Sequence, residues 1–572
     1  MQDEAMTSPI TNAVRALATA LLLLAMAACG DPSGEPSPEI EAIVANADGP
    51  VTIRLPDGDT LVLSEPVVRF YRDRGYLQAW TDYDEILDRG WQLLKVMENA
   101  GQDGLDPVRY RFPVALSMVQ QVEEDSLEEE QEPGHMAAVD LVLSEVFGRY
   151  ANHLVGGVLD PSASGLDWEI PKDSVDTYAL LVRLATDENP EAIIESLRPE
   201  VPEYHLLMDQ LARYQRIVRE GGWQPVRGEI PTDIGQSGAG VVELRNRLIK
   251  EGDAEEVRLA QYGAAAPTVY DDSLAAAVEH FQVRHALQPD GRVGASTLEQ
   301  LNTSAEERVQ QIVLNLDQWR WLPQNLGDSY ILVNVAGFEL EYIRDDTVAL
   351  AMNVVVGQEG WETAIFADTM EHIVVNPYWN VPPSIRNDEV IPAIQRDPGY
   401  LSRNNMEVLA GSSVVPASSI DFGNLEAYSF RQKPGSRNAL GRVKFLFPNE
   451  HDIYLHDTPA DQLFSAHSRA FSHGCIRLEK PLELARMLLD DVTDTPSSQL
   501  DEMLERDTEQ WINLTKELPV YILYFTAWAG RDGTMRFYPD IYERDRRLQE
   551  QVEQELRIDP RTPRRVASGE SR

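Results

Sequence analysis

The sequence predicts a multidomain α+β protein whose helical regions come first and whose mainly-β region comes last. Apolar residues recur every three or four positions from about residue 65 to residue 302, which is the period of helices. After residue 329 the apolar period changes to two, which is typical of strands. A length of 572 residues leaves room for two to four domains.

The composition is that of a globular protein with a large excess of acid. Hydrophobic residues make up 43% of the chain and charged residues 25%, so there is ample material for a core. The 94 acidic and 50 basic residues give a net charge of −44, which argues against nucleic acid and anionic membrane surfaces as partners. The two cysteines, Cys29 and Cys475, are too few for a disulfide framework, and we expect no bridge between them.

Residues 1–28 have the anatomy of a secretory signal peptide, with a start at Met1 or Met6. Their apolar run is too short to span a bilayer. The small residues before Cys29 resemble a bacterial lipobox, although Met26 stands where a leucine is usual, and this resemblance implies a lipid on Cys29. We therefore expect an exported, periplasmic protein that is tethered to a membrane by that lipid. Residues 29–64 are predicted to be a flexible tether with a short hairpin near its end.

Residues 65–224 are predicted to form an all-helical domain. Val67 and Phe70 share one helix face, and Ala137–Leu154 has the apolar pattern of a buried helix. The acidic run Glu123–Glu132 predicts a solvated loop. The domain shows no catalytic cluster, and its isolated histidines are expected to be surface or satisfied core residues: His135, His153 and His205.

A compact three-helix unit is predicted over residues 241–302, after a boundary rich in Pro, Gly and Ser at residues 225–240. Leu274, Val278 and Phe281 recur at helical spacing, and a Gly-rich turn follows them before the last helix. A long insert rich in Ala and acid separates the first two helices of the unit.

Residues 329–526 are predicted to form a mainly-β domain, and residues 527–572 a C-terminal hairpin and a charged, frayed tail. The predicted strands are Tyr330–Val335, Phe338–Ile343, Thr347–Val356, His372–Asn376, Arg442–Phe447, Ile453–Leu455 and Val520–Phe525. Residues 377–422 interrupt the β pattern and include a helical stretch at residues 385–397. An insertion of that size is more often a functional lid than an idle loop, so we predict a lid.

The residues around Cys475 carry the strongest chemical signal in the chain. A thiol attacks as its thiolate, and a nearby histidine is the usual means of lowering its pKa. His456 lies upstream at the end of a predicted strand, and the ends of adjacent β elements can bring it to the cysteine. Gly474 permits a close backbone approach, so that N–H groups around the cysteine can receive an oxyanion. Arg477 can hold a substrate carboxylate.

Two other interpretations of these residues stay open at this point. A lone cysteine is commonly a small buried hydrophobe, although the polar Ser-His-Gly setting argues against that here. A metal cluster can also be drawn from His451, His456, His467, His473 and Cys475. Their spacing does not match the common zinc patterns, and we expect no metal.

His456 and the motif Ser472-His473-Gly474-Cys475-Ile476-Arg477 resemble the signature of the L,D-transpeptidase catalytic domain, the YkuD-like fold. Residues 376–385 and 438–445 resemble the large, lid-bearing subgroup typified by YcbB, which also carries a scaffold domain and a peptidoglycan-binding domain. Residues 272–302 resemble such a peptidoglycan-binding unit.

The resemblance implies Cys475 as the nucleophile, His456 as the proton donor and acceptor, and His473 in a supporting role. Ser472, Gly474 and Arg477 are expected at the oxyanion or the substrate. Asp457 replaces the glycine often found after the histidine of the family, which leaves open which group orients His456.

The same resemblance implies 3→3 cross-linking of peptidoglycan stem peptides through a thioester acyl-enzyme, with a donor tetrapeptide and an acceptor stem. It implies no metal or organic cofactor, and inhibition by carbapenems. Two alternatives remain. One is a cysteine hydrolase of the same fold, acting on wall stem peptides or on wall-anchored protein. The other is a non-catalytic wall-binding protein.

Overall fold

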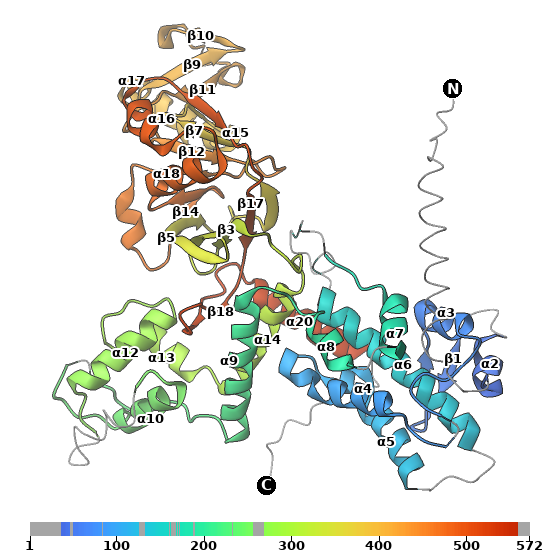
Figure 1. Cartoon of the computed structure of the whole chain (residues 1–572). Helices are drawn as coiled ribbons and strands as arrows, with labels where there is room; N and C mark the ends of the chain where they lie inside the picture. Colours follow the sequence, from blue (N-terminus) through green and yellow to red (C-terminus); the bar gives the residue numbers. More distant parts are fainter. Residues whose placement is uncertain are drawn as a thin grey trace, which may run out of the picture. The chain divides into compact units, whose positions relative to one another are not determined.

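The computed structural model describes residues 36–558 apart from 46–49, 83, 125–131, 160, 162–167, 169, 171, 187–188, 232, 255–267, 398 and 422. The described chain divides into two compact units (Figure 1). The first unit comprises residues up to Gly156 together with Ser174–Arg198, and the second Gly157–Asp173 and the chain from Pro199 onward. The predicted signal peptide, Cys29 and residues 559–572 lie outside the described residues. No described helix is both long enough and apolar enough to cross a bilayer.

The first unit is built from helices around the 25-residue helix α6, as the sequence predicts. Its elements are α2 (Pro38–Val44), β1 (Thr52–Arg54), β2 (Thr60–Val62), α3 (Glu65–Asp73), α4 (Asp88–Glu98), α5 (Phe112–Glu123), α6 (Glu132–Gly156), α7 (Thr177–Thr186) and α8 (Pro190–Glu195). Asp140 of α6 is buried and accepts hydrogen bonds from the hydroxyl of Tyr71 and from three consecutive backbone N–H groups at residues 79–81. This carboxylate therefore holds the segment after α3 against the central helix.

The prediction of a flexible tether over residues 29–64 is wrong for its middle part. The hairpin of β1 and β2 forms as expected, but residues 38–44 form helix α2, which packs against α3 and α6. Ser37 caps the helix, a proline begins it, and Ile40 and Val44 are fully buried. Two apolar residues four positions apart are enough to anchor so short a helix, and the polar residues around them hide this signal.

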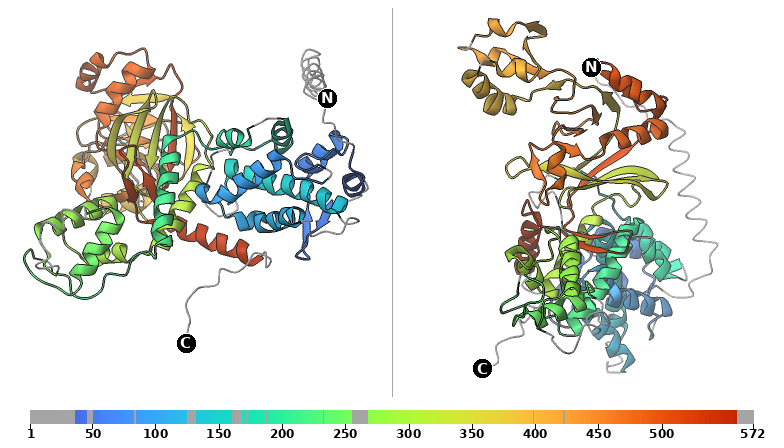
Figure 2. Two further views of the ribbon diagram at one scale, coloured as in Figure 1. Left: turned by 60° about the horizontal axis from the view of Figure 1, so that its bottom comes forward. Right: turned by 90° about the vertical axis from the view of Figure 1, so that its left-hand side faces the viewer.

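The second unit begins with a helical part that includes the predicted three-helix unit. Its helices are α9 (Pro202–Arg219), α10 (Val241–Glu251), α12 (Asp272–Arg284), α13 (Ala295–Asn302) and α14 (Ala305–Trp319). Leu274, Val278 and Phe281 are fully buried in one core with Leu244 and Leu248, as predicted. Most of the predicted insert, residues 255–267, lies outside the described residues. Helices α9 and α14 pack along each other, which Figure 2 shows from two sides.

A long sheet forms the frame of the catalytic region. Its strand order is β16-β7-β12-β13-β15-β5-β4-β3-β17-β6, with β14 beside β5. The strands are β3 (Ser329–Asn334), β4 (Glu339–Arg344), β5 (Thr347–Gly357), β6 (Phe366–Thr369), β7 (His372–Val375), β12 (Val443–Leu446), β13 (Leu455–His456), β14 (Ala470–Ser472), β15 (Ile476–Leu478), β16 (Gln510–Asn513) and β17 (Pro519–Leu523). Helix α18 (Pro481–Val492) and α19 (Leu500–Glu505) follow β15 along the chain. All seven predicted strands are confirmed, whereas β6, β14, β15 and β16 are too short to show a period.

The insertion after β7 is a subdomain with its own sheet, which corrects the prediction of a β-free interruption over residues 377–422. Its elements are β8 (Trp379–Asn380), α15 (Pro383–Ile385), a π-helical turn (Arg386–Val390), α16 (Ile391–Arg396), α17 (Tyr400–Arg403), β9 (Met406–Ala410), β10 (Ser413–Val415) and β11 (Ser429–Gln432). The strands pair in the order β10-β9-β11-β8, so the sheet runs beyond residue 422. The subdomain has its own core around Val390, Ile394 and Phe430. It lies at one end of the catalytic region (Figures 1 and 2).

The C-terminal hairpin forms as predicted, but residues 544–558 of the tail that follows it form a helix. Strands β18 (Ala527–Ala529) and β19 (Met535–Phe537) pair around the predicted turn. Residues 544–558 then form helix α20, which packs on α14. The prediction of a frayed tail from Arg544 is wrong because Arg544, Asp545 and Leu548 are buried. Leu548 and Val552 join the same apolar cluster, but the many charged residues around them give the sequence little sign of that contact.

Candidate active site

The pairing of two short strands places His456 beside the cysteine motif. Strand β13 runs parallel to β15, with Leu455 opposite Ile476 and His456 opposite Arg477. Cys475 immediately precedes β15, so the register places His456 beside the motif that contains the cysteine. Direct contact between the thiol and the imidazole stays a prediction.

His456 is almost fully buried and is oriented by the backbone of the next residue. Its Nδ1 lies 2.5 Å from the carbonyl oxygen of Asp457. A carbonyl can only accept, so Nδ1 carries the proton and Nε2 is left as an acceptor. Burial, with smaller effects from Arg477 and Lys444, lowers the pKa of His456 to about 3. The imidazole is therefore neutral at neutral pH and able to take a proton.

Asp457 resolves the question of what orients the imidazole. Its carboxylate accepts hydrogen bonds from the N–H of Arg442 at 2.6 Å and from the N–H of Thr458 at 2.7 Å. Gly441 has a φ of +59°, and a Cβ there would lie 2.2 Å from the Asp457 side chain. The chain thus requires glycine at 441 and a locked Asp457, and together they fix the carbonyl that holds His456.

Cys475 is half-buried and its thiol is protonated in this state. Its Sγ lies 3.7 Å from the carbonyl oxygen of Asp452, to which the thiol donates. Burial raises the pKa of the Cys475 thiol above its usual value, although hydrogen bonds from Tyr454 act in the opposite direction. The expected lowering of the thiol pKa by the histidine is thus not seen. The pair consists of a neutral thiol and a neutral imidazole.

A buried hydroxyl network fixes the peptide plane before the cysteine. Thr363 Oγ1 donates to the carbonyl oxygen of Gly474 at 2.8 Å, and Ser472 Oγ donates to the carbonyl oxygen of Cys475 at 2.6 Å. The hydroxyl of Tyr542 donates to the carbonyl oxygen of Gly357 at 2.5 Å, at the end of β5, and the N–H of Gly357 donates to Thr363 Oγ1 at 2.9 Å. Since C=O and N–H point opposite ways in a trans peptide, fixing Gly474 O also fixes the Cys475 N–H. Sequence reasoning did not identify Thr363 or Tyr542, because neither lies in a recognisable motif.

His473 contacts the insertion after β7. Its Nε2 lies 3.2 Å from Oε1 of Glu389 in the π-helical turn, and its ring packs edge-on against Trp361 at a centroid distance of 5.0 Å. The predicted supporting histidine therefore contacts the insertion. Among the described residues, no group of three or more His, Cys, Asp or Glu side chains is arranged to hold a metal ion.

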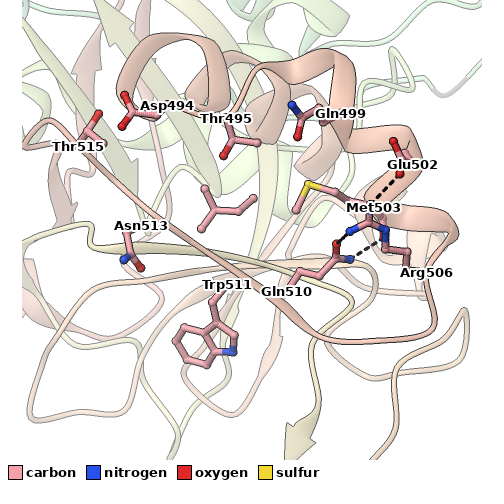
Figure 3. Close-up of a pocket in the computed structure, with 11 residues that line it drawn as sticks. Asp494, Thr495, Gln499, Glu502, Met503, Arg506, Gln510, Trp511, Asn513 and Thr515 are labelled. Atoms are coloured by element: carbon pink, nitrogen blue, oxygen red, sulfur yellow. Dashed lines mark hydrogen bonds and ion pairs between the residues drawn. The ribbon is translucent and has the colours of Figure 1, made fainter.

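A separate cavity of about 640 Å³ lies at the edge of the sheet, between β16 and the segment that contains α19. Figure 3 shows its lining, in which Arg506 interacts with Glu502 and Gln510 while Met503 faces the hollow. None of the lining residues belongs to the Ser472–Arg477 motif. This cavity is thus distinct from the cysteine motif.

Comparison with known proteins finds three families along the chain. Residues 328–520 match the model described as "L,D-transpeptidase catalytic domain". Residues 65–211 match "Scaffold domain", and residues 237–301 match "Putative peptidoglycan binding domain". A curated relative from Haemophilus influenzae, "Putative L,D-transpeptidase", is 34% identical over 251 residues, which are 43% of this chain and 50% of the relative. The chain thus spans about half the length of the curated relative that it matches.

Solved structures of L,D-transpeptidases are also similar. The structure from Mycobacterium smegmatis covers 34% of this chain and 58% of its own, at 13% identity and a TM-score of 0.17. The structure from Xylanimonas cellulosilytica covers 51% of this chain and 100% of its own, at 15% identity and a TM-score of 0.16. The family models carry the assignment: residues 328–520 are an L,D-transpeptidase catalytic domain, in a chain that also contains a scaffold domain and a peptidoglycan-binding domain.

Proposed function

We propose that this protein forms 3→3 cross-links between peptidoglycan stem peptides through a thioester on Cys475. The observation that carries the proposal is the parallel pairing of β13 with β15, which sets His456 beside the cysteine motif. The bond from Nδ1 of His456 to Asp457 O leaves Nε2 free for proton transfer. A neutral imidazole next to a protonated thiol is the starting state that a general base needs.

The first step transfers the donor acyl group to the enzyme. Nε2 of His456 takes the thiol proton as Sγ of Cys475 attacks the carbonyl at the L-centre of the third residue of the donor stem. The N–H of Cys475, held by the bond from Thr363 to Gly474 O, receives the developing oxyanion. The intermediate collapses, His456 returns the proton to the leaving amine, and the terminal D-alanine departs.

The second step transfers the acyl group to the acceptor. The side-chain amine of diaminopimelate on another stem attacks the thioester, and His456 takes a proton from that amine. The carbon–sulfur bond breaks, the proton goes back to Sγ, and the cross-linked product leaves. The two steps together need no group beyond the residues named and the two stems.

Product analysis tests the function directly. Purified protein is incubated with disaccharide-tetrapeptide, and the products are separated and weighed. We expect a dimer that has lost one D-alanine, and no product from Cys475→Ser or His456→Ala, both of which should keep the melting temperature of the parent. Trimmed monomer alone would show a hydrolase instead, and substantial turnover by His456→Ala would make His473 the base.

A carbapenem provides a second test of the nucleophile. We expect a covalent adduct on Cys475, seen as an increase in intact mass equal to one carbapenem and absent from Cys475→Ser. A protein that only binds the wall would give no adduct and would keep its cellular role as Cys475→Ala.

We also propose that the protein is exported to the periplasm and held by a lipid on Cys29. The support is the apolar run at residues 16–28 and the small residues before Cys29. Mass spectrometry of the mature N-terminus tests this, because Cys29→Ser should abolish a diacylglycerol-sized mass increase. An unmodified Cys29 in the mature protein would contradict the tether.

A further inference from the structure

One row of residues crosses five neighbouring strands of the catalytic sheet. Trp511 lies opposite Val374, Val374 opposite Lys444, Lys444 opposite His456, and His456 opposite Arg477. Residues directly opposite each other on paired strands project from the same face of a sheet. Lys444 and Arg477 therefore flank the proposed general base, each one strand away, at a strand spacing of about 4.8 Å.

Both flanking cations lack an ion pair among the described residues. The ammonium of Lys444 lies 5.5 Å from the ring centroid of Trp511 rather than on a carboxylate. Glu509, whose charge acts on Lys444, is already engaged: its Oε1 accepts from Tyr378 N–H at 2.8 Å and its Oε2 from Trp511 Nε1–H at 3.1 Å. Lys444 and Arg477 are half-buried on either side of one imidazole, and neither forms an ion pair with a described residue. The chain has 94 acidic and 50 basic residues, so carboxylates are plentiful. Because burying an unpaired charge costs free energy, this arrangement indicates an anionic ligand.

The proposed chemistry identifies which anion belongs there. The leaving group of the first step is an α-amino acid, so its amine and its carboxylate are attached to the same carbon. The amine must meet Nε2 of His456, and the carboxylate then lies within a few ångströms of it, at the distance of the next strand on either side. Lys444 and Arg477 stand at those two strand positions. The Lys444 ammonium lies toward Trp511, on the side of β12 away from His456, so it must swing across the sheet to meet the carboxylate.

We propose that Lys444, together with Arg477, binds the terminal carboxylate of the donor stem and thereby selects stems that end one residue beyond the scissile bond. The inference rests on the proposed function and adds a specificity residue to it. In a longer stem, the carboxylate is replaced by a peptide bond to the next residue. That amide has no negative charge to pair with Lys444 and Arg477. The contact of the ammonium with the Trp511 ring is a cation–π interaction that the carboxylate of the donor would replace with a charge-assisted hydrogen bond.

The test compares two donors that differ only in that carboxylate. Disaccharide-tetrapeptide with a free terminal D-alanine and the same compound ending in D-alaninamide are given to the parent protein, Lys444→Met and Lys444→Arg. We expect the parent to prefer the free acid by roughly tenfold to a hundredfold in kcat/KM, the range of a charge-assisted hydrogen bond. Lys444→Met should lose most of this preference through a higher KM for the acid, and Lys444→Arg should keep most of it.

Two controls separate recognition from folding. Lys516→Met removes a lysine whose Nζ donates to Asp491 O away from the motif, and it should keep the full preference. For Lys444→Met, a melting temperature equal to that of the parent shows an intact fold, so that a loss confined to the acid donor reports the carboxylate contact. Equal losses for both donors would show a structural lysine, and no preference in the parent would show that the carboxylate is not recognised.

Binding without turnover keeps the inference separate from the proposed function. The Kd values of both peptides for Cys475→Ser, alone and combined with Lys444→Met, are measured by calorimetry. We expect the acid to bind roughly tenfold or more tightly than the amide, and this ratio to collapse with Lys444→Met. If the parent makes no product from either donor, the proposed function fails, but the Kd ratio still decides whether Lys444 binds the carboxylate.

Discussion

At the scale of single residues, the site combines a neutral imidazole and a neutral thiol rather than an ion pair. The carbonyl of Asp457 sets the tautomer of His456, and burial keeps that imidazole neutral. Burial also keeps the Cys475 thiol protonated. In the mechanism that we propose, proton transfer must therefore accompany attack on the substrate, and the bond from Thr363 to Gly474 O fixes the Cys475 N–H that would receive the oxyanion.

The buried imidazole predicts a specific dependence of stability on pH. The pKa of His456 is about 3 in the folded protein, against an ordinary value of about 6.5. Between these values the unfolded chain binds a proton that the folded chain does not. The stability contributed by neutral His456 is thus fully present above about pH 6.5 and falls as the pH drops toward about 3, by up to about 1.4 kcal/mol per pH unit.

His456→Gln removes this titration, so the variant should gain stability relative to the parent as the medium becomes acid. The measurement is the difference between the two melting temperatures at pH 7.5 and at pH 5. We expect the difference to shift in favour of the variant at pH 5. A difference that is the same at both pH values would mean that the imidazole is not held neutral by burial.

The sequence predicted the residues that we propose to carry the chemistry, but not those that position them. Cys475 and His456 stand in a recognisable motif, and the motif named them. Lys444 and Trp511 share a row with His456 only because of the strand register. That register sets which residues lie opposite each other in four strand pairings. Tyr542 comes from a segment far along the chain and packs behind the motif by tertiary folding. Such contacts have no local pattern.

At the scale of elements, the insertion is a folded subdomain that contacts the motif through one polar pair. Glu389 of the π-helical turn meets His473 next to Cys475. The sequence showed that the β pattern is interrupted, but strands of two to five residues with half-exposed faces are too short to display a period. We propose that the subdomain closes over the donor stem and keeps water from the thioester.

Removing the subdomain should raise hydrolysis relative to cross-linking. Val381 N–H donates to Phe430 O at 2.9 Å, so its two ends meet, and a short Gly-Ser linker can replace residues 382–429. The ratio of trimmed monomer to dimer measures the effect. Glu389→Gln weakens the contact with His473 and removes a charge that acts on Arg477, and we expect a smaller rise, up to roughly fivefold. Glu426→Gln changes an exposed acid of the same subdomain and should leave the ratio unchanged. An unaltered ratio in the linker variant would rule out a lid that excludes water.

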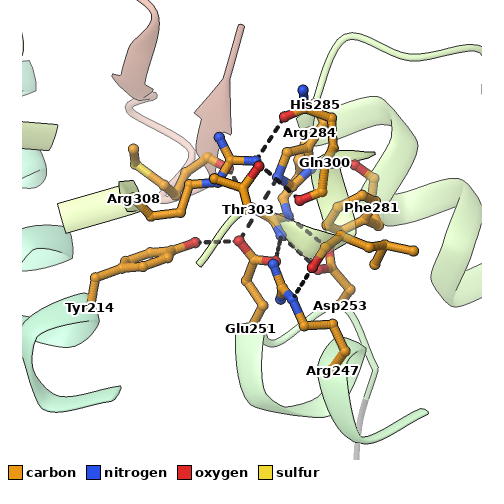
Figure 4. A network of polar contacts seen from close by, with 12 residues as sticks. Tyr214, Arg247, Glu251, Asp253, Phe281, Arg284, His285, Gln300, Thr303 and Arg308 are labelled. Carbon is orange, nitrogen blue, oxygen red and sulfur yellow. Dashed lines mark hydrogen bonds and ion pairs between the residues drawn. The ribbon is translucent and has the colours of Figure 1, made fainter. Parts of the chain in front are cut away.

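At the scale of the second unit, a buried network of charges joins the three-helix unit to its neighbours. Figure 4 shows Glu251 of α10 at its centre, where its carboxylate accepts from Arg247 at 2.5 Å and from the hydroxyl of Tyr214 in α9 at 2.7 Å. Arg284 of α12 forms a double hydrogen bond with Asp253 and donates to Met535 O in β19 at 2.9 Å. The peptidoglycan-binding unit is thus held to α9 and to the C-terminal hairpin by polar contacts that exclude water.

Because several positive charges surround Glu251, its replacement should lower the free energy of unfolding more than that of any other residue in this network. Burial alone would raise the pKa of Glu251, but Arg247, Arg284 and Arg308 outweigh it and hold that pKa well below its usual range. The stability it contributes is therefore present above the unfolded value near pH 4.5 and is lost as the pH falls below that value. Glu251→Gln leaves these arginines with too little negative charge, and breaking a buried pair in this way costs about 3–5 kcal/mol.

We therefore expect Glu251→Gln to lower the melting temperature of the second unit and to expose residues 225–240 to limited proteolysis, because the three-helix unit loses its main polar anchor. Asp501→Asn is the matched control. It breaks the ion pair between Arg486, whose side chain is 42% exposed, and Asp501, whose side chain is 73% exposed. Losing this surface pair should lower the free energy of unfolding by less than about 1 kcal/mol. No member of the Glu251 network lies in the Ser472–Arg477 motif, so turnover of a soluble donor well below the melting temperature should stay near that of the parent. If Glu251→Gln and Asp501→Asn have the same melting temperature and the same resistance to protease, the three-helix unit is held by its apolar contacts alone.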